Sequence, residues 1–147
     1  MKMRRKIFTT VALAFMLCLT GLVMPGTVLA QMTCVDNGDG TVADKGAGLM
    51  WQKATAGSMN WYDAMIYASS LSLGGHSDWR LPSRIELERL YRSPCKSIME
   101  VVFSNYWSSD THPTLPSGAW LVHFGPGSAY YGDKSLSYYV RAVRSGQ

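Results

Sequence analysis

Residues 78–86 have the sequence DWRLPSRIE, and this stretch decides how the middle of the chain folds. Ser83 and Glu86 have the S-x-x-E spacing of a capping box, in which each side chain accepts a hydrogen bond from the backbone N–H of the other residue. The spacing predicts a helix that opens here and ends at Ser93-Pro94, because proline disfavours helical geometry in the preceding residue. The apolar residues expected to face inward are Ile85, Leu87 and Leu90.

Another helix is expected before this one, over residues 60–73. Asn60 is a favourable N-cap. Gly74-Gly75 is expected to end the helix, since glycine most easily adopts the left-handed conformation found after a helix C-terminus. Residues at helical spacing would form its inner face: Trp61, Ala64, Met65, Ala68 and Leu71.

Strands are expected on both sides of the helices. Residues 41–43 and 49–52 are short apolar stretches joined by a glycine-containing loop, which predicts a β-hairpin. Later strands are expected at residues 105–109, 120–124 and 138–144, the last well inside the sheet because of its length. Trp120, Val122 and Phe124 would share one strand face. This order predicts an α+β fold, with two helices packed on a mainly antiparallel sheet.

The N-terminal 30 residues have the pattern of a secretory signal peptide. Four basic residues precede an uncharged apolar run over residues 7–23, and small residues stand where a signal peptidase cleaves. We expect cleavage after Ala30, which leaves one exported domain over residues 31–147, periplasmic or extracellular. The apolar run is too short for a stable membrane span, so no membrane insertion is expected after cleavage; an uncleaved anchor is the alternative.

Charge argues against several classes of partner. The chain has 14 Lys+Arg and 10 Asp+Glu, but four of the basic residues lie in the leader, which leaves ten of each sign. A neutral domain lacks the positive field that nucleic-acid binders use, so no nucleic-acid partner is expected. Its five tryptophans and eight tyrosines can bury large areas and still present polar tips for recognition.

Cys34 and Cys95 are the two cysteines that remain beyond the leader. In an oxidising compartment such a pair predicts a disulfide. A catalytic or metal-binding thiol is the alternative, but neither cysteine has a histidine or another cysteine at ligand spacing.

Five short stretches follow one another along the chain: DNGDGTV (36–42), GLMW (48–51), DWRLP (78–82), YWSS (106–109) and VRAVR (140–144). Together they resemble the DUF1566 family, also called the Lcl C-terminal domain family. The resemblance implies a C-type-lectin-like fold, related to that of formylglycine-generating enzymes, in which the later strands and loops form the binding surface. It also implies an association with sulfated glycosaminoglycans, as for the collagen-like adhesin that names the family.

The chain departs from this family in two respects. It has no collagen repeat, so trimerisation driven by such a repeat does not carry over and the oligomeric state stays open. Ala142 stands where many relatives have a cysteine, so their disulfide pairing does not transfer directly.

The sequence carries no catalytic constellation, and neither enzymatic activity nor a cofactor is expected. His76, His112 and His123 are isolated, without metal-ligand spacing. Formylglycine-generating relatives need active-site cysteines near the C-terminus, and this chain has none there. A calcium loop around residue 39 fails because Val35 and Ala43 occupy ligand positions.

Several charged residues are expected to be structural. Arg80 and Arg141 stand among apolar residues, and a buried arginine must be paired, with Asp78 or Asp44 as the expected partner. A ligand-binding role is the alternative. Arg89, Arg92 and Lys96 form a stripe that a sulfated chain could follow, but nearby glutamates favour an ordinary mixed helix face.

The best ligand candidates lie beyond residue 105. Aromatic rings stack on the C–H faces of sugars, and polar side chains bind their hydroxyls. The candidate ligand-binding residues are Trp107, Asp110, His112, Trp120, His123, Tyr130, Tyr131 and Asp133. A place in the core is the alternative for Trp107 and Trp120. Tyr130 and Tyr131 follow a Gly-Pro-Gly turn and are expected to be exposed.

These observations predict an exported binding module that recognises a glycan or another surface polymer. A protein-interaction or structural module of the cell envelope, without a small ligand, is the alternative. An enzyme of the formylglycine-generating kind is less favoured, since it needs a reactive thiol.

Overall fold

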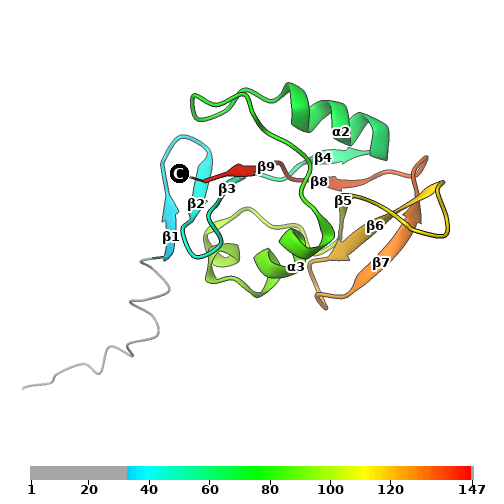
Figure 1. Ribbon diagram of the computed structural model, residues 1–147. Coiled ribbons are helices and arrows are strands. Elements are labelled where there is room, and N and C mark those ends of the chain that lie inside the picture. The colour runs from blue at the N-terminus through cyan, green and yellow to red at the C-terminus, as the bar shows by residue number, and fades with distance from the viewer. Residues whose placement is uncertain (1–32, 147) are drawn as a thin grey trace, which may run out of the picture.

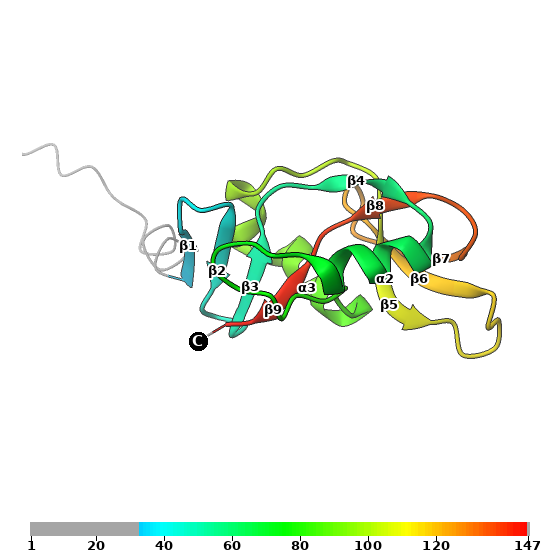
Figure 2. The same cartoon turned by 90° about the horizontal axis from the view of Figure 1, so that it is seen from above.

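Two β-sheets form the framework, and the last part of the chain passes from one to the other (Figures 1 and 2). This computed structural model describes residues 33–146, so the predicted leader lies outside the described residues. The first sheet has the order β1 (Cys34–Asp36), β2 (Thr41–Asp44), β3 (Leu49–Gln52) and β9 (Val143–Ser145). The second has the order β4 (Ala56–Met59), β8 (Tyr138–Val140), β5 (Asn105–Thr111), β6 (Gly118–His123) and β7 (Ala129–Asp133).

Within residues 33–146, every strand pair is antiparallel except β5 with β8. Together with the helices described below, these sheets confirm the predicted α+β class. The predicted hairpin is also confirmed, with Val42 opposite Trp51. The prediction of one continuous strand over residues 138–144 is wrong. It is divided into β8 and β9, which belong to different sheets, because the backbone of Ala142 pairs with Gln52 between the two strands.

Helix α2 (Trp61–Ser70) covers one face of the second sheet (Figure 1). Asn60 caps it by accepting a hydrogen bond from Asp63 N–H at 2.9 Å. Ala64 and Ala68 are buried as predicted, but Met65 points outward and is 37% exposed. The helix also ends earlier than predicted, at Ser70. Gly74-Gly75 forms the following tight turn, with φ of +60° and +76°, instead of ending the helix.

Helix α3 (Arg84–Arg92) begins as the capping box predicts. Ser83 Oγ accepts from Glu86 N–H, and Glu86 accepts from Ser83 N–H. Leu87 and Leu90 are buried, but the inward position predicted for Ile85 is wrong, since its side chain is 53% exposed. Residues two apart on a helix point about 200° apart, so Ile85 and Leu87 cannot both face the core. A 3₁₀ helix, η1 (Pro94–Ile98), follows.

The core has two parts because successive strand residues point to opposite faces of a sheet. Tyr106 belongs to the cluster under α3, together with Leu87, Leu90, Val122 and Phe124. Trp107 belongs to the cluster under α2, together with Ala64, Ala68, Leu121 and Val140. The predicted Cys34–Cys95 disulfide is confirmed, and it joins β1 to η1.

The pairing predicted for Arg80 and Arg141 is wrong. Arg141 is buried as expected, but Arg80 is exposed. Its guanidinium is fully buried and donates to the carbonyls of Gln52, Lys53 and Glu100 and to the hydroxyl of Thr55. These backbone carbonyls and the Thr55 hydroxyl take the place of the expected carboxylate. Asp78 instead pairs with Arg144, and Arg80 binds both carboxylate oxygens of Glu86. Within residues 33–146, no helix has the length and apolar character needed to span a membrane.

Candidate functional site: an aromatic ledge

Strands β5, β6 and β7 lie at the end of the molecule away from the first sheet (Figure 2). Trp120 on β6 and Tyr131 on β7 are cross-strand partners, so their side chains share one face. It is the face of Val122 and Phe124, as the alternation predicts. Those two side chains are buried near α3, whereas Trp120 is half-buried and Tyr131 is 57% exposed. The sheet therefore presents aromatic rings to solvent beyond the first turn of α3.

Two further planar side chains continue this surface. The guanidinium of Arg84, the first residue of α3, lies 4.7 Å from the centre of the Trp120 ring. The His112 ring lies 4.9 Å from Trp120 and 4.9 Å from Tyr131. We call the row of Arg84, Trp120, His112 and Tyr131 the aromatic ledge.

Backbone contacts hold the ledge in place. Asp110 Oδ2 accepts a hydrogen bond from Arg84 N–H at 2.7 Å, which ties the end of β5 to the start of α3. His112 N–H donates to the carbonyl of Gly118 at 2.9 Å, and Thr114 N–H lies 3.4 Å from His112 Nδ1. The imidazole is therefore oriented by the loop that joins β5 to β6.

A buried lysine supports the same loop. Lys134 Nζ donates to Thr111 Oγ1 at 2.8 Å and to the carbonyl of Pro116 at 3.0 Å. It also lies 4.1 Å from the centre of the Trp61 ring. Neither Lys134 nor Arg84 is evident as a site residue from the sequence, because each acts on residues far away in the chain.

Chemically, the ledge combines stacking surfaces with hydrogen-bond donors. Tyr131 offers an open ring face, and the guanidinium of Arg84 can donate to hydroxyl, carboxylate or sulfate oxygens. Glu88 Oε1 lies 3.7 Å from Arg84 Nε, on one side of the guanidinium. Such a surface can bind a polar ring without any covalent step.

The remaining sequence candidates do not join the ledge. The ligand-binding role predicted for Trp107 is wrong. Its side chain is fully buried, and its Nε1–H donates to the carbonyl of Met59, so the alternative of a place in the core holds. His123 and Tyr130 alternate with Trp120 and Tyr131, so they point to the other face of the sheet. Asp133 caps a turn, and the N–H and hydroxyl of Ser135 lower the pKa of its carboxyl group.

One group of potential metal ligands converges within residues 33–146. It consists of Cys34, Cys95 and Asp44, whose ligand atoms lie within 4.8 Å of one another. The two sulfurs are bonded to each other, so the group has only one carboxylate to offer a metal ion.

Fold and site together define an α+β domain with an exposed aromatic surface on its second sheet. The family model of the Lcl C-terminal domain matches residues 40–144, so the chain belongs to that family. No curated protein matches the chain.

Proposed function

We propose that this protein is an exported, non-enzymatic binding module that recognises a glycan or another surface polymer through the aromatic ledge. The observation that carries the proposal is the continuous row of Arg84, Trp120, His112 and Tyr131. A sugar ring would stack on Tyr131, while Arg84 and His112 bind its hydroxyl or anionic substituents. The predicted leader supports export.

The chemistry of the potential nucleophiles also supports a binding role. Cys34 and Cys95 form a disulfide, so neither is a thiolate. Ser108 is fully buried, and its hydroxyl donates to the carbonyl of Trp120 at 2.9 Å. A formylglycine-generating type of reaction would need a free thiol instead.

A glycan array tests the proposal with two tyrosine variants. Tyr130 and Tyr131 are adjacent and similarly exposed, at 48% and 57%, but only Tyr131 lies on the ledge. We expect Tyr131→Ala to weaken glycan binding at least about tenfold, which corresponds to about 1.4 kcal/mol. Tyr130→Ala is the matched control and should bind as the wild type does. A folded wild-type domain that binds no glycan or polysaccharide, or equal losses in both variants, would refute the proposal.

One observation favours the alternative of a protein-interaction module. Tyr62, Met65 and Ile66 form an exposed apolar stripe on α2, with Ile66 62% exposed. Exposed apolar patches of this kind are typical of protein interfaces. If a pull-down from envelope extracts retained a partner with the wild type but lost it with Ile66→Asp, while no glycan bound, this second function would be preferred.

A further inference from the structure

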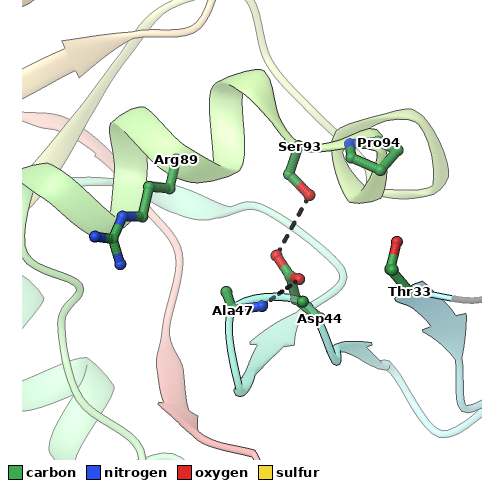
Figure 3. A pocket seen from close by; sticks show the side chains of 7 residues that line it. Thr33, Asp44, Ala47, Arg89, Ser93 and Pro94 are labelled. Carbon is green, nitrogen blue, oxygen red and sulfur yellow. Dashed lines mark hydrogen bonds between the residues drawn. The ribbon is translucent and has the colours of Figure 1, made fainter. Parts of the chain in front are cut away.

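An open depression of about 320 Å³ lies between the turn that joins β2 to β3 and the last turn of α3 (Figure 3). Its volume is within the range of sites for small molecules. It is lined by residues around Asp44 on one side and by Arg89 and Ser93 of the helix end on the other. Arg84 of the aromatic ledge is at the opposite end of α3, so the two sites are separate.

Asp44 places an uncompensated negative charge in the wall of the depression. The residue is only 6% exposed. Its Oδ1 accepts from Ala47 N–H at 3.0 Å, and its Oδ2 accepts from Ser93 Oγ at 3.3 Å (Figure 3). In the part of the chain that the structure describes, no basic side chain pairs with it. A buried carboxylate without a cation is costly, so a cationic ligand group would stabilise it.

Arg89 places a free positive charge on the opposite wall. The glutamates of α3 that were expected to neutralise it are occupied, since Glu86 binds Arg80 and Glu88 lies beside Arg84. Over residues 33–146, Arg89 has no carboxylate partner. Figure 3 shows its side chain reaching down from the helix across the opening from Asp44. A guanidinium binds carboxylates and phosphates through paired N–H donors.

We propose that this depression binds a small zwitterion, with its ammonium group at Asp44 and its carboxylate at Arg89. A simple anion would be repelled by Asp44, and a simple cation, including a metal ion, would be repelled by Arg89. Only a molecule that carries both charges complements both walls. The Ser93 hydroxyl can also accept a hydrogen bond from the ammonium group.

The inference is tested by adding small amino acids as ligands, together with derivatives that lack one of the two charges. The probes are unbranched ω-amino acids of increasing length, each compared with its N-acetyl form and its carboxamide form. Binding is followed by NMR through the backbone amide shifts of Ala47 and Ser93. We expect a restricted range of chain lengths to shift these signals, and both blocked forms to bind at least about tenfold more weakly.

Variants that remove one charge each test the roles of Arg89 and Asp44 in binding. Arg89→Gln and Asp44→Asn should each weaken binding of the best zwitterion at least about tenfold. Arg92→Gln is the control, because Arg92 is exposed on the same helix but does not line the depression. Thermal melting shows whether each variant is folded. Because Arg89 is exposed, Arg89→Gln remains informative even if Asp44→Asn unfolds.

The inference is overturned if no zwitterion shifts these amides, if an acetylated form binds as tightly, or if Arg92→Gln weakens binding as much as Arg89→Gln. It is independent of the glycan proposal, since Tyr131→Ala should leave zwitterion binding unchanged.

Discussion

The guanidinium of Arg141 donates hydrogen bonds to backbone carbonyl groups of separate segments of the chain. The carbonyls of Gln52, at the end of β3, of Lys53 and of Glu100 converge on it, and Glu100 is far from the other two in sequence. Buried carbonyl groups need donors, and arginine offers five N–H groups in a fixed plane. One side chain therefore joins the end of β3, the start of β4 and the loop before β5.

Replacing Arg141 by methionine removes these donors and keeps much of the side-chain volume. We expect the free energy of unfolding to fall by about 3 kcal/mol or more, because each unpaired buried carbonyl costs about 1–3 kcal/mol. Urea unfolding monitored by tryptophan fluorescence measures the loss. Arg92→Met, on an exposed site, is the control, and a similar small effect of both changes would contradict this role.

Gly127 is required for two reasons at once. Its φ is +76°, and a Cβ atom there would overlap the ring of Tyr91. Gly48 has a similar φ of +65°, but a Cβ atom there would meet nothing within 4 Å. Alanine variants of these two glycines therefore distinguish the cost of a left-handed backbone from the cost of steric overlap with Tyr91.

We expect Gly48→Ala to destabilise the protein by about 1 kcal/mol, the cost of a left-handed alanine. Gly127→Ala should cost about 1–3 kcal/mol more, because Tyr91 must move out of its packed position. Thermal unfolding of both variants provides the comparison. Equal losses would show that Tyr91 gives way freely.

At the scale of elements, α3 links the fold to both candidate sites. Its first turn is held by the capping box, by the Arg80–Glu86 ion pair and by Asp110 from β5. Its first residue, Arg84, lies over the Trp120 ring in the ledge, and Arg89 in its last turn lines the depression. The position of this helix therefore sets the geometry of both proposed sites.

The first turn of α3 is expected to weaken in acid. Burial alone would raise the pKa of Glu86, but hydrogen bonds from Arg80 and from Ser83 N–H outweigh it and hold the pKa below the usual 4.5. Because the folded pKa is the lower one, this stabilisation is full above the unfolded pKa and is lost as the pH falls through the folded pKa.

Glu86→Gln should therefore be less stable than the wild type at neutral pH and should approach it in acid. The measurement is the free energy of unfolding from neutral pH to about pH 3. Parallel curves for the two proteins would show that Glu86 contributes no pH-dependent stability.

At the scale of the whole molecule, the disulfide ties the edge of the first sheet to the segment after α3. Cys34 and Cys95 are 61 residues apart in sequence, and Cys95 is fully buried. The cross-link restricts the unfolded chain over this long loop, which the chain-entropy model values at about 4 kcal/mol.

We expect the double variant Cys34→Ser, Cys95→Ser to lose about 4 kcal/mol of unfolding free energy and to keep its helices. Denaturant unfolding with circular dichroism measures both. Wild-type protein in a reducing agent should show a comparable loss, and an unchanged unfolding midpoint would contradict the prediction.

The sequence by itself determined the local features and the class of the fold. The Asn60 cap, the Ser83–Glu86 capping box and the hairpin depend on residues close together in the chain, and all three are present. The Cys34–Cys95 bond could be predicted because the chain beyond the predicted leader has only this pair of cysteines. The order of helices and strands was enough to predict an α+β fold.

Only the tertiary structure decided which of these residues reach solvent and which partners they meet. Trp107 and Trp120 both stand in strands that the sequence predicts, yet the first is fully buried and the second is part of the ledge. Arg141 binds carbonyls instead of a carboxylate. The physical reason is that burial and pairing depend on contacts between segments far apart in the chain, and local periodicity does not contain the register of those contacts.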